Sequence, residues 1–507
     1  MNRAARRMAA RPPRGYAPPP GMKPPPPRPP PAAPLRRALG VALTSVWCAL
    51  VVLAPLVAAW MASSLAAHAG WRGGAAAASG LLVFPVLPVA WELVASWRAS
   101  RRPARGRAWL SRGDRVVLRT LAVSVAFVGT LLALDPQRAF VALNSRGDWM
   151  LDGRRDPRAE SVRRGLFSSA ARLQWLVQRA RDEAQRPVAR PLPAGVARVL
   201  PTRVDNPVQP APRPSPARDP HAWPWDDALH PAVASLPASA ETSPEAVGRY
   251  LAAAEADPLR RARAVHDYVA DRVVYDVEAY RAGVYPPQDA LTTFRTRRSV
   301  CAGYAALFEA IGRAAGLTVE TVTGRARGLV HAGMGEAHAW SAVRLDGRWH
   351  LVDTTWDAGH VDAEGFHKQF GARYFLAPPE VFGTKHFPDD ARWQLLPVAR
   401  TEGEYLRTPA LDPRFFAHGL RLVSPDRAES DARAALAVVV DNPQGASLMV
   451  SVRPDGGASL ACDVEGVARV TARCPLAGDG LHEVTLFVAR ERYTTHWSAG
   501  VLRVHNR

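Results

Sequence analysis

Cysteine is scarce throughout this sequence of 507 residues, and acidic residues are scarce near its start. Four cysteines are too few for a disulfide-dense scaffold or for a metal site built from several cysteines. Residues 1–115 contain 17 lysines and arginines but only two acidic residues, Glu92 and Asp114. A nucleic-acid-binding domain would carry such a basic excess on a folded surface. Here the excess flanks apolar segments, which favours a membrane over nucleic acid.

Long apolar runs occupy the first quarter of the chain. Residues 38–67 contain no charged side chain, and residues 75–97 and 116–134 contain one each. About 20 apolar residues are enough for a helix to cross a bilayer. The sequence therefore predicts an all-α membrane anchor of three transmembrane helices within residues 38–134, with two prolines kinking the second helix.

Lysine and arginine are distributed unequally around these runs. The tail of residues 1–37 has nine and the segment 98–115 has seven, whereas the loop between the first two runs has only Arg72. The positive-inside rule places the tail and the second loop in the cytoplasm. Three spans then put the rest of this integral membrane protein on the extracytoplasmic side.

Proline dominates the tail, which contains no acidic residue. The runs at 24–27 and 29–31 predict an extended polyproline II conformation. Two interpretations remain open: a docking peptide for a Pro-motif reader on the cytoplasmic side, or a solvated tail without a partner. The tail has almost nothing to bury, so we favour the second.

A stalk and a linker are expected over residues 135–240. Residues 157–187 have a partial apolar stripe typical of a helix, and residues 188–240 are rich in proline and poor in periodic apolar residues. The run Ser243-Pro244-Glu245 then has a capping hydroxyl, a first-turn proline and an acidic side chain, as helix starts do. The sequence therefore predicts a globular domain over 241–400.

A cysteine stands at the start of a predicted helix in this domain. Cys301 precedes an apolar helical pattern through Leu307, Phe308 and Ile311, and Gly316 supplies the stop. The unpaired backbone N–H groups and the dipole at a helix start favour a thiolate. A lone cysteine before an apolar helix is usually a core residue, so Cys301 needs suitable partners to be a nucleophile.

Two candidate partners lie on a predicted β-hairpin. Asp346-Gly347 is a strong turn signal between residues 337–345 and 348–356, which both have the alternation of strands. His338 and Asp353 share a face of this hairpin if the pairing slips by one residue around the turn. Asp353 would accept the imidazole N–H, and the other ring nitrogen of His338 would deprotonate the cysteine.

Six short motifs in this order resemble a known family. They are Val300–Ala305, His338–Trp340, Trp349–Trp356, Tyr374–Leu376, His386–Pro388 and Trp393–Leu396. The first three resemble the transglutaminase-like superfamily of papain-fold cysteine enzymes, and the last three resemble its kyphoscoliosis-peptidase branch. The resemblance covers roughly residues 242–400. Ser299 departs from it, because the family often has glycine at this position and a Cβ would crowd the loop before the cysteine.

The resemblance implies an α+β papain-like domain with a catalytic triad of Cys301, His338 and Asp353, acting on amide or peptide bonds. The oxyanion donors that fit are the backbone N–H of Cys301 and, as a candidate, the side chain of Gln288. No cofactor is expected. No metal is expected either, because the histidines of this region match no metal-binding spacing.

Strand patterns replace helical ones over residues 412–507, and turn signals separate them at even intervals. This predicts a β-sandwich of immunoglobulin-like size. Cys462 and Cys474 are either both free or joined in a disulfide, which the outward topology favours. Cys48 in the first apolar run is interpreted as a small apolar residue. Cys301 is then the one cysteine of this half without a partner.

Two functions remain open from the sequence. The first is a membrane-anchored thiol enzyme that acts on a protein or peptide substrate through a thioester. Hydrolysis by a peptidase is preferred there to transfer onto a lysine amine, because the resembling branch is peptidase-like. The second is a catalytically inert module that binds a protein or an envelope polymer. The apolar runs contain no firm polar pathway, so we interpret them as an anchor and not as a transport unit.

Overall fold

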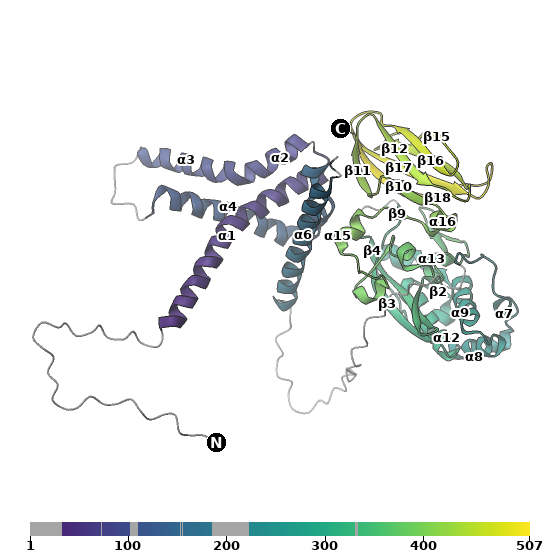
Figure 1. The fold of residues 1–507 in the computed structure, drawn as a ribbon. Helices are drawn as coiled ribbons and strands as arrows, with labels where there is room; N and C mark the ends of the chain where they lie inside the picture. Colours follow the sequence, from purple (N-terminus) through teal and green to yellow (C-terminus); the bar gives the residue numbers. More distant parts are fainter. Residues whose placement is uncertain are drawn as a thin grey trace, which may run out of the picture.

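The computed structural model describes residues 33–71, 73–101, 110–152, 154, 156–184, 223–329 and 333–506. It contains a helical N-terminal half, a mixed domain of helices and strands, and a strand-rich C-terminal region (Figure 1). The Pro-rich tail, with its candidate docking peptide for a Pro-motif reader, lies outside the described residues. So do residues 185–222 of the expected linker.

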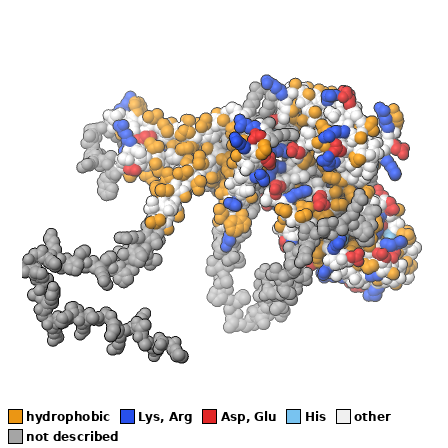
Figure 2. All heavy atoms as spheres, in the orientation of Figure 1, with side chains coloured by type: hydrophobic (Ala, Val, Ile, Leu, Met, Phe, Trp, Pro, Cys, Tyr) orange, Lys and Arg blue, Asp and Glu red, His pale blue; other side chains and the backbone are white. Residues whose placement is uncertain are grey.

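Three helical stretches of the N-terminal half are long and apolar enough to cross a membrane, as the sequence predicts. They are Val41–His68, Gly73–Ser100 and Arg112–Leu134. The helices that form them are α1 (Ala33–His68), α2 (Gly73–Leu81), α3 (Leu87–Ser100) and α4 (Arg112–Leu134). Hydrophobic side chains cover much of their outer surface (Figure 2). Phe84 leaves the helical conformation beside Pro85, so the second stretch is interrupted where prolines predict a kink.

Charged residues within these helices pair with one another. Glu92 of α3 forms ion pairs with Arg115 and Arg119 of α4, and the Arg115 Nε to Glu92 Oε1 distance is 3.3 Å. A carboxylate facing two guanidinium groups avoids an unpaired charge between the helices. The only two acidic residues of the first 115 positions therefore have defined roles, since Asp114 forms a capping box with Ser111 at the start of α4.

Further helical segments lie between the three apolar stretches and the mixed domain. They are α5 (Pro136–Arg146), η2 (Trp149–Leu151) and α6 (Pro157–Ala184). Leu143 of α5 and Ala170 of α6 are fully buried in one cluster with residues of α1 and α4. Beyond this cluster, the guanidinium of Arg407 lies 3.4 Å from the ring centroid of Phe167 in α6. The expected stalk is therefore packed between two parts of the molecule.

Residues 223–240 were expected to be linker but belong to the mixed domain. They include α7 (Pro231–Ala234) and η3 (Ala238–Ala240). Val233 is fully buried in the domain core, and Trp225 packs against it. The Trp223 indole N–H donates to the carbonyl of Arg373 at 3.1 Å. The domain therefore begins before residue 241, because isolated apolar anchors in a Pro-rich segment leave no periodic pattern to detect.

The mixed domain places helices against a small antiparallel sheet of order β5-β4-β3-β8. Its helical elements are α8 (Pro244–Ala254), α9 (Pro258–Arg272), α10 (Val277–Ala282), α11 (Ala290–Thr296), α12 (Cys301–Ala314), α13 (Thr354–Ala358), α14 (Pro379–Phe382), η4 (Ala391–Gln394) and α15 (Glu402–Arg407). Its strands are β1 (Val274–Tyr275), β2 (Arg298–Ser299), β3 (Thr318–Ala326), β4 (Glu336–Leu345), β5 (Arg348–Val352), β6 (Gly359–Val361), β7 (Phe366–Lys368) and β8 (His386–Pro388). Val265 of α9 and Phe308 of α12 meet Val343 of β4 in the buried core. This packing fixes the start of α12 relative to β4.

Two sheets that share one apolar core make up the C-terminal region. Their orders are β10-β12-β16-β15 and β11-β18-β17-β13-β14, with β9 pairing with β18. The elements are β9 (Ala410–Leu411), α16 (Pro413–Ala417), β10 (Arg421–Ser424), β11 (Glu429–Ala432), β12 (Ala435–Asp441), β13 (Ser447–Pro454), β14 (Leu460–Ala461), β15 (Asp463–Glu465), β16 (Arg469–Pro475), β17 (Gly480–Ala489) and β18 (Trp497–Asn506). Val438 and Leu486, from different sheets, are buried in this core. A disulfide joins Cys462 to Cys474.

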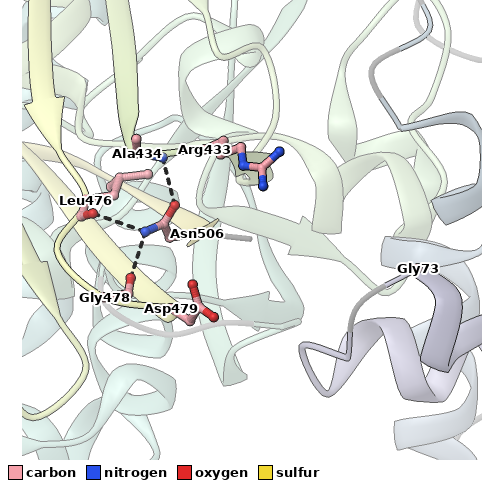
Figure 3. Close-up of a pocket in the computed structure, with 7 residues that line it drawn as sticks. All are labelled: Gly73, Arg433, Ala434, Leu476, Gly478, Asp479 and Asn506. Carbon is pink, nitrogen blue, oxygen red and sulfur yellow. Dashed lines mark hydrogen bonds between the residues drawn. The ribbon is translucent and has the colours of Figure 1, made fainter.

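The C-terminal region contacts both other parts of the molecule. Lys385, next to β8, forms a buried ion pair with Asp412, and Nζ lies 3.2 Å from Oδ2. Toward the three apolar stretches, a hollow of about 560 Å³ opens between Gly73 of α2 and the ends of the C-terminal strands (Figure 3). Asn506 holds one wall of the hollow in place (Figure 3). Its side-chain oxygen accepts a hydrogen bond from the Ala434 N–H, and its side-chain nitrogen donates to the carbonyls of Leu476 and Gly478.

Candidate functional site

Cys301 is the first residue of α12. Val300 before it is extended (φ −92°, ψ −179°) and forms the N-cap, so the helix starts at the cysteine. Tyr304 and Phe308 of the same helix are fully buried and hold this end of α12 in the core. Cys301 itself is half-buried and forms no disulfide. Its backbone N–H has no partner within the helix, because the first N–H groups of an α-helix never do.

The β4–β5 hairpin carries the two candidate partners. Its ladder shows no register shift. Continuing the ladder by one pair sets Asp353 opposite Trp340, two residues from His338, so both side chains share a face without the slip that the sequence interpretation required. β5 ends at Val352 and not, as expected, at Trp356, because the chain turns into α13.

The two oxygens of the Asp353 carboxylate have different tasks. Oδ1 accepts hydrogen bonds from the backbone N–H groups of Thr355 (2.9 Å) and Trp356 (3.2 Å), which caps α13. Oδ2 lies 2.8 Å from Nε2 of His338 and 2.9 Å from Nε2 of His386. The carboxylate is fully buried, so its position is fixed by the helix that it caps.

The structure brings Cys301 and His338 into contact. Their side chains interact, and this interaction and the backbone N–H of Ala339 both act to lower the pKa of the thiol. Since Nε2 of His338 is bound to Asp353, the other ring nitrogen is the one that faces the thiol. The three predicted residues therefore form one chain of contacts from sulfur to carboxylate.

Electrostatics in this chain favour charge separation. Burial acts to raise the pKa of Cys301, but the hydrogen bond and the positive charge of His338 lower it below the usual thiol value. Burial acts to lower the pKa of His338, but the charge and hydrogen bond of Asp353 raise it to about 10. Burial opposes ionisation of Asp353, but His338 outweighs it and the pKa of Asp353 falls well below its usual value. These shifts all act in favour of a thiolate, an imidazolium and a carboxylate over the neutral groups.

His386 on β8 is a further member of this cluster whose role the sequence did not reveal. It is almost fully buried, with its ring centroid 4.1 Å from that of Phe382 and 4.5 Å from that of Trp356. Burial lowers the pKa of His386 to about 4, so the ring is neutral and donates its Nε2–H to Asp353. His386 therefore positions the carboxylate that orients His338.

Gln288 contacts the segment that leads into Cys301. Its side-chain oxygen accepts hydrogen bonds from the Ser299 hydroxyl (2.5 Å) and the Val300 N–H (3.0 Å), and its nitrogen donates to the Pro286 carbonyl (2.8 Å). Gln288 thus holds the entry to α12 from the side. The role of Gln288 as an oxyanion donor stays a prediction.

Ser299 fits beside the nucleophile because another glycine makes room for it. Its side chain is buried, and it accepts a hydrogen bond from the Thr293 hydroxyl at 3.3 Å. A Cβ added at Gly303 would stand 1.9 Å from the Ser299 hydroxyl oxygen. The crowding expected from Ser299 is therefore relieved at Gly303, in the first turn of α12.

Two groups of side chains could hold a metal ion by proximity of their ligand atoms. The first is His338, Asp353 and His386, and the second is Asp362, Glu364 and His367. In the first, both imidazoles already bind one carboxylate oxygen, which is the pattern of a hydrogen-bond network. The second lies in the exposed β6–β7 hairpin. The expectation of no resident metal stays a prediction.

Comparison with known proteins places this site in a family. A family model of the transglutaminase-like superfamily matches residues 245–354. The chain is 34% identical over 238 residues to the kyphoscoliosis peptidase of Mus musculus and 33% identical over the same length to that of Homo sapiens. Each match covers 42% of this chain and 35% of the relative. The chain thus spans about a third of the length of these curated relatives.

Two further matches are more distant. The Lim and transglutaminase domain protein ltd-1 of Caenorhabditis elegans is 30% identical over 130 residues, which cover 24% of this chain and 17% of that protein. A crystal structure described as that of a TGase is 21% identical, covers 26% of this chain and 36% of that one, and has a TM-score of 0.19. Together, the family model and the curated relatives confirm the resemblance drawn from the motifs. Residues 245–354 form a domain of the transglutaminase-like superfamily, and the closer likeness is to the kyphoscoliosis-peptidase branch.

Proposed function

We propose that this protein is a membrane-anchored cysteine enzyme that acts on protein amide bonds through Cys301, His338 and Asp353. One observation carries the proposal: His338 binds the carboxylate of Asp353 through Nε2 and interacts with the thiol of Cys301, so its other ring nitrogen is left for the sulfur. A histidine held in this way can move a proton between the sulfur and a substrate while its charge is balanced.

The proposed reaction begins with the thiolate of Cys301. The sulfur attacks the amide carbonyl carbon, and the carbonyl oxygen becomes an oxyanion within reach of the Cys301 backbone N–H. Collapse breaks the C–N bond, the imidazolium of His338 protonates the leaving amine, and a thioester remains on the sulfur. A second nucleophile then attacks the thioester, loses its proton to His338 and frees the thiolate.

The second nucleophile decides the product. Water gives a carboxylic acid, as in a peptidase, whereas a lysine amine gives a new amide, as in a cross-linking transferase. We favour hydrolysis, because the curated relatives carry the name peptidase. Protein or peptide chains are the substrate class in both cases.

We further propose that the catalytic domain lies on the extracytoplasmic side. The distribution of lysine and arginine around the three apolar helices supports this orientation. The disulfide between Cys462 and Cys474 fits an oxidising compartment. Fusions of an alkaline phosphatase and of a green fluorescent reporter to the C-terminal end test it. Phosphatase activity without fluorescence is expected, and the opposite result contradicts this side.

We also infer the architecture of the mixed domain and of the C-terminal region. We interpret the mixed domain as papain-like, with α12 carrying the nucleophile against a sheet that carries the histidine. We interpret the two C-terminal sheets over a shared core as an immunoglobulin-like β-sandwich. The second interpretation bears on partner binding, because such domains often present their loops to other proteins.

The test uses the full chain in detergent micelles with an unfolded protein as substrate and a biotinylated primary amine as competing acceptor. Mass spectrometry should find new chain ends, and the Cys301→Ala variant should produce none. The matched control, Cys48→Ala, should retain the wild-type rate, because Cys48 lies in α1. Amine incorporation in place of new ends would identify a transferase.

The alternative is a catalytically inert module that binds a protein or an envelope polymer. It is favoured if neither product forms, and if the Cys301 thiol reacts with iodoacetamide no faster than an ordinary thiol. Retention of a partner by both wild type and the Cys301→Ala variant would then define the module by binding alone.

A further inference from the structure

Three side chains form an acidic and aromatic surface beside the candidate nucleophile. Tyr280 comes from α10, Tyr285 from the segment that follows it, and Glu336 from the start of β4. Tyr280 is 37% exposed and Tyr285 is 52% exposed, so both rings are open to solvent. Large exposed aromatic side chains next to a reactive group are well placed to contact a substrate.

The strand geometry ties Glu336 to the catalytic histidine. Glu336 and His338 are two residues apart on β4, so their side chains project from the same face. Glu336 is exposed, whereas His338 lies largely buried behind it. The Tyr280 hydroxyl donates a hydrogen bond to Oε2 of Glu336, which connects α10 to β4 across this surface.

The same cluster interacts electrostatically with the sulfur. Tyr275, behind Tyr280 with a ring-centroid distance of 6.0 Å, is influenced by the charges of both Cys301 and Glu336. The hydrogen bond to Glu336 and burial raise the pKa of Tyr280 to about 12, so its hydroxyl stays protonated at neutral pH. Glu336 and Cys301 therefore both act electrostatically on the same pair of tyrosines, Tyr275 and Tyr280.

The basic side chains nearby are already engaged. Arg281 donates to the carbonyls of Asp362 and Ala363, and Arg298 pairs with Asp276 and Glu278. Arg325 is opposite Ala337 in the β3–β4 ladder and thus lies on the face away from Glu336. Among the residues that the structure describes, Glu336 forms no ion pair with a cation of the chain, so its charge is available to a ligand.

We propose that Glu336, with Tyr280 and Tyr285, binds a cationic side chain of the substrate, a lysine or an arginine, next to the bond that Cys301 attacks. The carboxylate supplies the counter-charge, and the two ring faces take the aliphatic stem and the cation. This inference rests on the proposed function, because the bound group belongs to the substrate of Cys301. It narrows the substrate class to basic peptide segments.

The experiment measures the alkylation rate of Cys301 in the full chain in detergent micelles, with Cys48→Ala in every variant so that one free cysteine remains. The probes are bromoethylamine (cationic), iodoacetamide (neutral) and iodoacetate (anionic). In the Glu336→Gln variant we expect the ratio of the cationic to the neutral rate to fall about fivefold, which is the scale of one partly exposed charge pair. The ratio of the anionic to the neutral rate should rise. Glu491→Gln removes an exposed carboxylate far from this surface in the sequence and should leave both ratios unchanged.

Tyr280→Phe tests the charge of Glu336 separately from its hydrogen bond to α10. It removes the hydroxyl that binds Glu336 but keeps the carboxylate, so the preference for the cationic reagent should persist. If Tyr280→Phe loses the preference as fully as Glu336→Gln, the pair is a structural link and the inference is overturned. A reactive Cys301 whose charge ratios are the same in wild type and Glu336→Gln overturns the inference alone. A Cys301 that is inert toward iodoacetamide defeats the proposed function, and the inference with it.

Discussion

His266 and His338 lie in two regions of the mixed domain, and both are buried beside carboxylates. In the helical core, Nδ1 of His266 lies 2.8 Å from Asp267 and Nε2 lies 3.1 Å from Asp357. At the hairpin, Nε2 of His338 lies 2.8 Å from Asp353, and its other nitrogen faces the thiol of Cys301. Carboxylates raise the pKa of both rings against the effect of burial.

The difference lies in how many ring nitrogens remain for chemistry. Both ring nitrogens of His266 bind carboxylates, so this histidine links α9 to α13. Only one ring nitrogen of His338 binds a carboxylate, and the other can exchange a proton with the sulfur of Cys301. A buried histidine next to an acid and with a raised pKa is thus no sufficient sign of catalysis. The contact of the second nitrogen separates the two cases.

The largest expected effect belongs to His266→Gln. The substitution removes the positive charge beside the buried carboxylates of Asp267 and Asp357, and this should lower the free energy of unfolding by about 3 kcal/mol. The thermal midpoint of the full chain in micelles should fall by roughly 6–12 °C. Alkylation of Cys301 by iodoacetamide at 10 °C should keep its wild-type pH profile. A change in that profile would mean that the two histidines are coupled and would break the comparison.

The pH dependence of stability should also distinguish the wild type from His266→Gln. The raised folded pKa of His266 gives a contribution that is complete below the unfolded value of about 6.5 and is lost as pH rises through the folded pKa. His266→Gln should therefore lose less stability than wild type as pH rises above about 6.5.

His386→Gln should have the opposite pH signature. The folded pKa of His386 is about 4, below the unfolded value, so wild type loses about 2 kcal/mol from this group between pH 7 and pH 5. The glutamine amide can still donate to Asp353 but does not titrate. The drop in thermal midpoint on acidification to pH 5 should shrink by roughly 4–8 °C. An unchanged drop would show that His386 is already charged in the folded state.

His338→Ala should slow alkylation of Cys301 at pH 5.5 by about 30-fold. Without the imidazolium, the thiol returns to an ordinary pKa of about 8.5, at which only about one thiol in 1,000 is ionised at pH 5.5. The greater nucleophilicity of a more basic thiolate offsets part of this loss. The rate in wild type should be flat from mildly acidic to neutral pH, whereas the rate in the variant should rise up to about pH 8.5. A flat profile in the variant would show that the helix start alone forms the thiolate.

Asp353→Asn should have a smaller effect of about tenfold on the same rate at pH 5.5. The amide still accepts a hydrogen bond from His338, but it no longer stabilises the imidazolium, so the pKa of His338 falls and that of the thiol rises. The rise of the alkylation rate with pH should shift to higher pH than in wild type. An equal rate in both proteins would mean that Asp353 only caps α13.

Local patterns were enough to predict that Cys301 starts a helix and that His338 and Asp353 share a face of a hairpin, because a helix start and a two-residue turn depend on neighbouring residues. The catalytic roles of these residues came from the family motifs and stay a prediction. The register also follows from the turn: Asp346-Gly347 sets the ladder, and no slip is needed. The end of β5 was misplaced because Asp353 combines two tasks, and its capping of α13 has no signal in strand alternation.

Nonlocal contacts were out of reach. His386 meets Asp353 only because β8 pairs with the far side of β3, and strand order is not encoded in periodicity. Its segment had been noted as part of a family motif, without a role. Trp223 and Trp225 escaped for a related reason, since they act as isolated anchors on a domain whose main elements come later.

The buried pair of Lys385 and Asp412 has a practical consequence for dissecting the protein. Lys385 precedes His386 directly, and its ammonium lies 4.5 Å from the ring centroid of Trp356. Asp412 is anchored to β18, because its N–H donates to the carbonyl of Ala499 at 2.8 Å. A fragment that ends at residue 400 would lack Asp412. The Lys385 ammonium would then be unpaired in an apolar environment, one residue from His386, which positions Asp353. Expression designs that seek the thiol chemistry should therefore extend to the last strand.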